Sequence, residues 1–173
     1  PIIGEDFYAS IDIKIQHFAH EALKSAIEKN NAKGGSVVVM DVTTGEILAI
    51  SNQPSGDLSL SENRTPKIYK NKAITDKFEP GSTFKPLMMA AALENKIYQA
   101  DDTIDTSPYK IGSRTIQDPR YHGVLSMEEV LIKSSNAGIS KIALEIDPCN
   151  LYTFFNGLGF GQVTSSGFPG EAS

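Results

Sequence analysis

The sequence predicts an α+β fold, in which an antiparallel sheet flanked by helices is followed by a mostly helical subdomain. Three observations predict it: helical spacing of apolar residues over 12–31, two β-forming runs joined by a tight turn over 36–51, and renewed helical patterns over 82–160. With 173 residues, 40% of them hydrophobic, the chain has the composition of a folded protein with a sizeable core.

The first helix is expected over 12–31. Its apolar residues recur at intervals of three and four, and they are Ile15, Phe18, Ala19, Ala22, Leu23, Ala26 and Ile27. Asp12 is a suitable N-cap, and the run NNAKGG that follows is typical of a helix stop. One face of this helix is therefore apolar, and we expect it to cover a sheet.

The next element is a β-hairpin over 36–51. The runs SVVVMDV and EILAIS have β-forming composition and are separated by TTG, a strong turn signal. A hairpin of two strands is only marginally stable in water, and a covering helix cannot satisfy the backbone edge of a strand. We therefore expect a second chain or a further segment to add strands to this sheet.

The remaining segments are predicted to form loops, short helices and one small hairpin. A polar loop is expected over 53–64, and a helix is expected from Ser82. Ser126 and Glu129 stand in the capping-box arrangement at the start of another helix. The other predicted elements are a hairpin in IGSRTIQD, a helix in AGISKIALEI after the interruption SSN, and a short helix in DPCNLYTFFNGLGFG.

Composition argues against several classes of protein. A formal charge of −5 leaves no basic excess to neutralise phosphates, so we expect no nucleic-acid partner. The longest apolar runs, SVVVM and PLMMAAAL, are too short to cross a bilayer, and the single cysteine, Cys149, cannot form an intrachain disulfide. His17 and His20 share a helical face but have no third candidate ligand nearby. We favour an exposed helical face there and expect no metal and no cofactor.

Ser82 and Lys85 are the first candidates for chemistry, in the stretch EPGSTFKPLMMAAALE. Three residues apart on a helix, their Cβ atoms would lie about 5–6 Å apart on one face. A serine hydroxyl becomes an effective nucleophile when a base takes its proton, and a lysine is such a base only when burial or nearby charge lowers its pKa. Backbone N–H groups at the helix start would stabilise a bound oxyanion. The pair is therefore a candidate nucleophile and base.

Each short motif has a simpler interpretation when it is taken alone. S-x-x-K occurs by chance on the order of once in a couple of hundred residues, and it would then be a serine cap followed by a solvated lysine. The run SSN, Ser134 to Asn136, could equally be a turn that breaks a helix. Their order favours the chemical interpretation, because one motif opens an apolar helix, the other interrupts two helices, and a hairpin containing TGEILA precedes both.

This constellation resembles the penicillin-binding transpeptidases and serine β-lactamases, whose signature combines S-x-x-K, S-D-N and K-T-G. The segments MDVTTGEILAISNQP, NKAITDKFEPGSTFKP, TIQD, LIKSSNAGISKIA and GFPGE are similar to class B penicillin-binding proteins, in particular to division-type peptidoglycan D,D-transpeptidases. The resemblance implies a penicillin-binding protein or serine β-lactamase-like fold, with residues 1–173 as the N-terminal portion of one transpeptidase domain.

The resemblance also implies roles for four residues. Ser82 would be the acylated nucleophile and Lys85 its general base. Ser134 would pass a proton to the leaving amine, and Asn136 would hold the substrate's amide and the lysine ammonium. Ser82, Ser134 and Asn136 would thus contact the substrate, a peptidoglycan stem peptide ending in D-Ala-D-Ala, or a β-lactam antibiotic.

The implied setting is septal cell-wall synthesis in a bacterium. The resemblance implies a location on the periplasmic face of the inner membrane, with an anchoring segment outside this sequence. It also implies divisome membrane proteins as partners.

The third family motif is a departure from this pattern. Neither K-T-G nor K-S-G occurs in the 173 residues. In relatives this motif recognises the substrate carboxylate and borders the oxyanion hole. We therefore expect the C-terminal strands that carry it to come from a second chain or segment. We also expect residues 1–173 alone to be aggregation-prone and unreactive toward penicillin.

Two alternative functions remain open from the sequence. A serine β-lactamase would fit STFK, but no base for a deacylating water is identifiable, and SSN differs from the S-x-V of the class D enzymes. A non-enzymatic β-lactam sensor of the same fold would instead be attached to a membrane signalling region.

Overall fold

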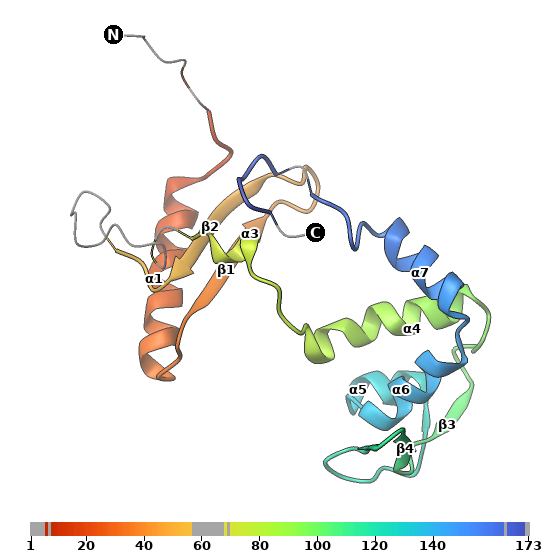
Figure 1. Ribbon diagram of the computed structural model, residues 1–173. Helices are drawn as coiled ribbons and strands as arrows, with labels where there is room; N and C mark the ends of the chain where they lie inside the picture. The colour runs from red at the N-terminus through yellow and green to blue at the C-terminus, as the bar shows by residue number, and fades with distance from the viewer. Residues whose placement is uncertain (1–5, 7, 57–67, 69, 165, 172–173) are drawn as a thin grey trace. The chain divides into compact units, whose positions relative to one another are not determined.

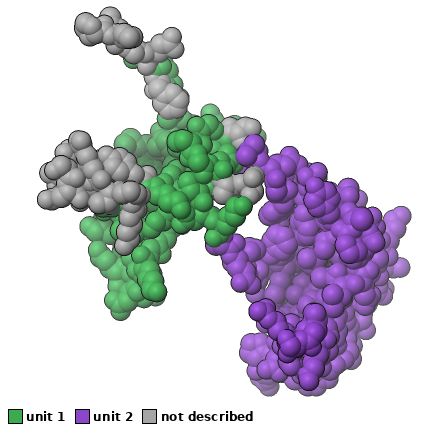
Figure 2. All heavy atoms as spheres, in the orientation of Figure 1, with its two compact units in different colours: residues 1–77, 165–172 green, residues 78–164, 173 purple. Residues whose placement is uncertain are grey.

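The computed structural model describes residues 6, 8–56, 68, 70–164 and 166–171. The chain divides into two compact units, residues 1–77 with 165–172 and residues 78–164 with 173 (Figure 2). Most of the polar loop predicted over 53–64 lies outside the described residues. Each unit has helices and strands of its own.

The first unit consists of helix α1 (Ile13–Lys29), a hairpin of strands β1 (Gly35–Met40) and β2 (Ile47–Gln53), and the short helix α3 (Lys72–Thr75) (Figure 1). The helix lies along the hairpin and contacts both strands. The strands pair antiparallel, with one irregularity after Val39. Helix α1 falls within the range predicted from the sequence, and the hairpin extends slightly beyond its predicted range at both ends.

Two local features fix α1 on the hairpin. Oδ1 of Asp12 accepts hydrogen bonds from the backbone N–H groups of the second and third helical residues at 2.8 and 3.0 Å, which caps the helix. Near its other end, Leu23 and Ile27 reach Gly35, where an added Cβ atom would lie 3.3 and 3.2 Å from their methyl groups. The missing side chain at Gly35 thus lets the apolar face of the helix approach β1 closely.

The outer edge of β2 is closed by a side chain. Gln16 Nε2 donates to the Ile50 carbonyl at 2.9 Å, and the Ile50 N–H donates to Gln16 Oε1 at 2.8 Å. The Asp12 N–H donates to the Leu48 carbonyl at 2.9 Å. These bonds satisfy backbone groups that a neighbouring strand would otherwise pair. Among the described residues β1 pairs with β2 alone, so the predicted extension of the sheet concerns the edge of β1.

Helices dominate the second unit. They are α4 (Lys85–Glu94), α5 (Met127–Ile132), α6 (Asn136–Glu145) and α7 (Pro148–Gly157) (Figure 1). Between α4 and α5 the chain forms two antiparallel pairs of short strands: β3 (Thr103–Asp105) with β6 (Val124–Ser126), and β4 (Tyr109–Ile111) with β5 (Arg114–Ile116). The β4–β5 pair confirms the hairpin predicted in IGSRTIQD, and the capping box of Ser126 and Glu129 is present at the start of α5.

The start of α4 differs from the prediction. The sequence suggested an α-helix from Ser82, but Gly81–Phe84 form a 3₁₀ turn and the α-helix begins at Lys85. Pro86 explains the difference, because it has no N–H to donate to the Ser82 carbonyl four residues back. The Lys85 N–H donates to that carbonyl instead, which is the 3₁₀ pattern. Ser82 therefore lies in a tight turn ahead of the helix.

The core of the second unit lies between its helices. Ala91 and Ala92 are fully buried, and their small side chains allow close packing where α4 contacts α5 and α6. The buried core residues are Met89, Ala91, Ala92, Ile104, Leu125, Met127, Val130, Ile139, Ile142 and Ile146. No helix within the described ranges has both the length and the apolar content needed to cross a membrane.

Gly138, in the first turn of α6, lies against Val130 of α5. An added Cβ atom would lie 3.0 Å from Val130 Cγ2 and 3.0 Å from Ser135 Oγ. The Gly138 N–H also donates to Ser135 Oγ at 2.8 Å. The connection between the two helices therefore depends on the absence of a side chain at this position.

Gly138→Ala should destabilise the protein by about 1–3 kcal/mol, because the new methyl group overpacks the contact with Val130. Gly157→Ala is the matched control, since Gly157 ends α7 with open space around it and gains up to about 1 kcal/mol from reduced backbone freedom. Thermal unfolding of the full-length protein measures both. Equal melting temperatures for the two variants would contradict this account of the packing.

Candidate active site

A cavity of about 390 Å³ in the second unit contains residues from both predicted motifs. Its polar groups include Ser82 in the turn ahead of α4, Lys85 at the start of α4 and Asn136 at the start of α6. Its apolar wall is formed by Phe84, Met88, Ile139 and Ala143. The cavity thus combines a hydroxyl, an amine and an amide with an apolar surface, a composition typical of a small-molecule site.

Hydrogen bonds connect all four predicted site residues. Lys85 Nζ donates to Asn136 Oδ1 at 2.7 Å, to Ser134 Oγ at 3.0 Å and to the Ser134 carbonyl at 2.5 Å. Ser134 Oγ in turn donates to Ser82 Oγ at 3.0 Å. Lys85 and Ser82 are therefore linked through the hydroxyl of Ser134. The helical spacing of Ser82 and Lys85 had predicted only that the two side chains lie close together, and it did not predict this connection through Ser134.

Lys85 is buried, with 9% of its surface exposed. Burial lowers the pKa of its amine below the ordinary value, and the negative charge of Asp118 opposes this effect. The three acceptors around Nζ match the three N–H donors of a lysine ammonium. The resting geometry therefore suits the charged lysine, while desolvation makes its proton easier to remove than that of a solvated lysine.

Ser134 has a left-handed backbone, with φ of 53°. Its N–H donates to the Leu131 carbonyl at 3.0 Å, and the Ser135 N–H donates to the Val130 carbonyl at 2.9 Å. These two bonds form a Schellman motif that ends α5, with Ser134 in the position usually taken by glycine. A serine in this conformation is strained, whereas a glycine would not be. Its side-chain hydroxyl forms hydrogen bonds with Lys85 Nζ and Ser82 Oγ.

Asp118 holds the start of α6, and the sequence did not reveal this role. Its Oδ2 accepts from Ser135 Oγ at 2.6 Å, and its Oδ1 accepts from the N–H groups of Asn136 and Ala137 at 2.5 and 3.0 Å. Ser135, which is fully buried, is also the N-cap of the helix. Asp118 ends the segment TIQD. A single aspartate after a predicted strand does not indicate that its hydrogen-bond partners lie at the start of α6, 17 to 19 residues later.

Aromatic contacts anchor the turn that carries Ser82. The ring of Phe84 stacks on Phe155 with centroids 4.8 Å apart and meets Phe160 edge-on at 5.4 Å. Phe155 and Phe160 also pack edge to face, at 5.6 Å. Each such pair contributes roughly 0.5–1.5 kcal/mol beyond the burial of its area. The 3₁₀ turn is thus attached to α7 and the segment after it.

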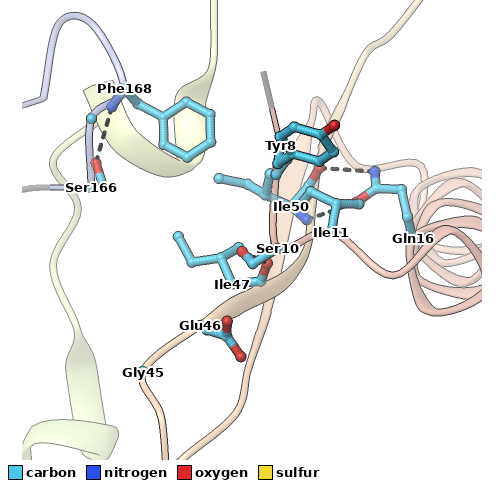
Figure 3. A pocket seen from close by; sticks show the side chains of 12 residues that line it. Tyr8, Ser10, Ile11, Gln16, Gly45, Glu46, Ile47, Ile50, Ser166 and Phe168 are labelled. Atoms are coloured by element: carbon cyan, nitrogen blue, oxygen red, sulfur yellow. Dashed lines mark hydrogen bonds between the residues drawn. The ribbon is translucent and has the colours of Figure 1, made fainter. Parts of the chain in front are cut away.

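A second cavity, of about 900 Å³, lies in the first unit and contains none of the predicted site residues. Tyr8, Phe168, and Ile47 and Ile50 of β2 are among the side chains that line it (Figure 3). Within the described ranges no three His, Cys, Asp or Glu side chains gather as metal ligands. His17 is exposed, as predicted, but His20 is half-buried and faces β2, where its Nδ1 lies 3.1 Å from Ser51 Oγ.

Comparison with known proteins agrees with the motifs. Residues 35–173 match the family described as Transpeptidase, the penicillin binding protein transpeptidase domain. The probable peptidoglycan D,D-transpeptidase PenA of Neisseria flavescens is 40% identical over 173 residues, which cover 100% of this chain and 43% of that protein. The peptidoglycan D,D-transpeptidase FtsI of Escherichia coli is 37% identical over 164 residues, which cover 95% of this chain and 28% of that protein.

A solved structure supports the same fold. The crystal structure of a peptidoglycan glycosyltransferase from Burkholderia ambifaria matches with a TM-score of 0.82 and 36% identity, covering 95% of this chain and 49% of that chain. This likeness confirms the predicted α+β fold class. The chain spans less than half the length of each of these three proteins.

The strain at Ser134 predicts an order of stability for two variants. Ser134→Gly and Ser134→Ala lose the same hydroxyl, but alanine keeps a Cβ atom in the left-handed conformation. The glycine variant should therefore be more stable than the alanine variant by about 1 kcal/mol. Chemical denaturation of both full-length variants measures the difference, and a more stable alanine variant would contradict the assignment of strain.

Proposed function

Because the chain belongs to the penicillin-binding protein transpeptidase family, we propose that it is part of a peptidoglycan D,D-transpeptidase that works through an acyl-enzyme on Ser82. The observation that carries this proposal is the hydrogen-bonded connection from Ser82 through Ser134 to the buried amine of Lys85. A hydroxyl joined in this way to an amine of lowered pKa has a route for losing its proton.

In the acylation step, the neutral Lys85 amine takes the Ser82 proton, passed along by the Ser134 hydroxyl. Ser82 Oγ then bonds to the carbonyl carbon of the penultimate D-Ala of a stem peptide. The peptide bond to the terminal D-Ala breaks, and the proton returns through Ser134 to the leaving amine. Asn136 orients both the lysine and the substrate's amide, since its Oδ1 already accepts from Lys85 Nζ.

The second step releases the enzyme. An amine from a neighbouring stem peptide attacks the ester carbonyl, which forms the cross-link and restores the Ser82 hydroxyl. A β-lactam would follow the first step, with its ring amide in place of the D-Ala-D-Ala bond, and would remain as a stable ester. Neither step draws on a cofactor.

The Ser82 N–H is proposed as one donor of the oxyanion hole, because it lies at the start of the α4 region. We propose that a K-T-G or K-S-G strand outside residues 1–173 supplies the other donor and recognises the substrate carboxylate. The absence of either motif in the sequence and the greater length of the relatives support this proposal.

We further propose a role in septal wall synthesis, on the periplasmic face of the inner membrane and with divisome proteins as partners. The name of the Escherichia coli relative, FtsI, supports the division-type assignment. Turnover of hydrolysed penicillin by the full-length protein would instead indicate a β-lactamase.

The nucleophile is tested with Ser82→Ala in the full-length protein. A fluorescent penicillin should label the wild type, and this variant should lose all labelling, because only the attacking hydroxyl is removed. Ser107→Ala is the control and should keep wild-type labelling, since Ser107 bonds with Asp105 away from the cavity. An adduct found by mass spectrometry on Ser134, Ser135 or another residue would show that Ser82 is not the nucleophile.

The base is tested with Lys85→Arg, which keeps a positive charge but cannot supply a neutral amine near neutral pH. We expect the acylation rate constant to fall by roughly 10²- to 10⁴-fold, the usual contribution of a general base. Lys133→Arg, at the exposed residue next to Ser134, should acylate normally. Circular dichroism checks that both variants fold, and near-normal labelling of folded Lys85→Arg would mean that another group deprotonates Ser82.

A further inference from the structure

We propose that Asp118 is a positioning residue of this site, which holds Ser134 and Asn136 in place around Lys85. The inference rests on the proposed function of Ser82 and Lys85. Asp118 itself touches neither of these side chains, and it acts through the turn between α5 and α6.

The geometry supports a fixed anchor. Asp118 is 9% exposed, and both of its carboxylate oxygens are engaged by the hydrogen bonds from Ser135, Asn136 and Ala137 described above. Hydrogen bonds to an ionised acceptor are the stronger kind, and a buried carboxylate with three donors is held in one orientation. Because Asp118 follows β5 closely, it attaches the start of α6 to the β4–β5 hairpin.

The anchored backbone carries the groups that surround Lys85. Asn136 is held at its N–H by Asp118, and its side-chain oxygen reaches Lys85 Nζ at 2.7 Å. Ser134 precedes the anchored Ser135 and contributes both its hydroxyl and its carbonyl to the same amine. Release of the anchor would therefore loosen all three acceptors of the lysine at once.

Charge provides a second effect. Burial raises the pKa of Asp118, but the hydrogen bonds from Ser135, Ala137 and Asn136 and the nearby His122 lower it by more, so the carboxylate is ionised at neutral pH. Its negative charge raises the pKa of Lys85 against the larger effect of burial. Two other titratable groups among the described residues lie near this site. Glu79 is on the cavity wall, and the charge of His122 lowers the pKa of Asp118.

Two substitutions separate orientation from charge. Asp118→Asn is nearly isosteric and keeps an oxygen for the backbone N–H groups, but it removes the charge. Asp118→Ala removes the hydrogen bonds as well. Asp147→Asn is the matched control, because Asp147 caps α7 through its own side chain, at Cys149 and Asn150, and has no contact with Lys85 among the described residues.

The measurement is the rate constant of penicillin acylation by the full-length protein against pH, together with the melting temperature. Asp118→Ala should lower the plateau by up to about 100-fold, since displacement of a catalytic group by 1 Å has effects of that size. Asp118→Asn should lower the plateau by a smaller factor. It should also shift the acid limb, the pH range in which the rate constant falls as Lys85 becomes protonated, to lower pH, because loss of the negative charge lowers the pKa of Lys85 further. Asp147→Asn should leave plateau and limb unchanged.

A folded Asp118→Asn variant with the wild-type plateau and an unmoved acid limb would overturn the inference and leave Asp118 as a helix cap alone. If Asp118→Ala fails to fold, the asparagine variant decides. An unlabelled wild type would count against the proposed function instead. The inference is then tested by following the ¹³C shift of Lys85 Cε against pH, where an equal pKa in wild type and Asp118→Asn would refute it.

Discussion

Three hydrogen bonds from the Lys85 amine join the start of α4 to the turn between α5 and α6, and the second unit is organised around this junction. The two segments are 49 residues apart in the chain. A buried amine without partners would be strongly destabilising, so the unit folds in a way that brings acceptors to it. Further along α4, the small residues Ala91 and Ala92 let the helix pack closely against α5 and α6 in the core of the unit.

Three irregular features of the second unit lie at this junction. Pro86 forces the 3₁₀ turn, which leaves the Ser82 hydroxyl exposed ahead of the helix. Ser134 accepts a left-handed backbone, and Gly138 permits the close approach of α6 to α5. Each feature is unfavourable or unusual for a regular helix, yet each orients a group that contacts Lys85 or the turn around it. Strain at a position such as Ser134 is typical of a functional site.

Local signals in the sequence predicted the elements that local interactions form. Asp12 caps α1 and the Ser126–Glu129 capping box opens α5 because capping involves residues only two or three positions apart. The spacing of Ser82 and Lys85 made them a candidate pair for the same reason, since the two residues are only three positions apart. Asp118 and Gln16 could not be assigned, because their partners lie 17 to 34 residues away and depend on how the elements pack. The link from Lys85 to Ser82 through Ser134 was hidden by the same long-range packing.

The separation of Asp118 from Lys85 has a chemical consequence. A carboxylate in direct contact with the lysine would stabilise the ammonium and raise its pKa, and the amine would then be a poor acceptor of the Ser82 proton. Here the carboxylate is bound to the backbone of Asn136, and the neutral amide oxygen of that residue meets the lysine. The amide of Asn136 thus keeps the lysine in position. The charge of Asp118 acts from further away, and it raises the pKa of Lys85 by less than burial lowers it. The arrangement therefore holds the lysine firmly and still keeps its pKa below the ordinary value, which is the combination that a lysine base requires.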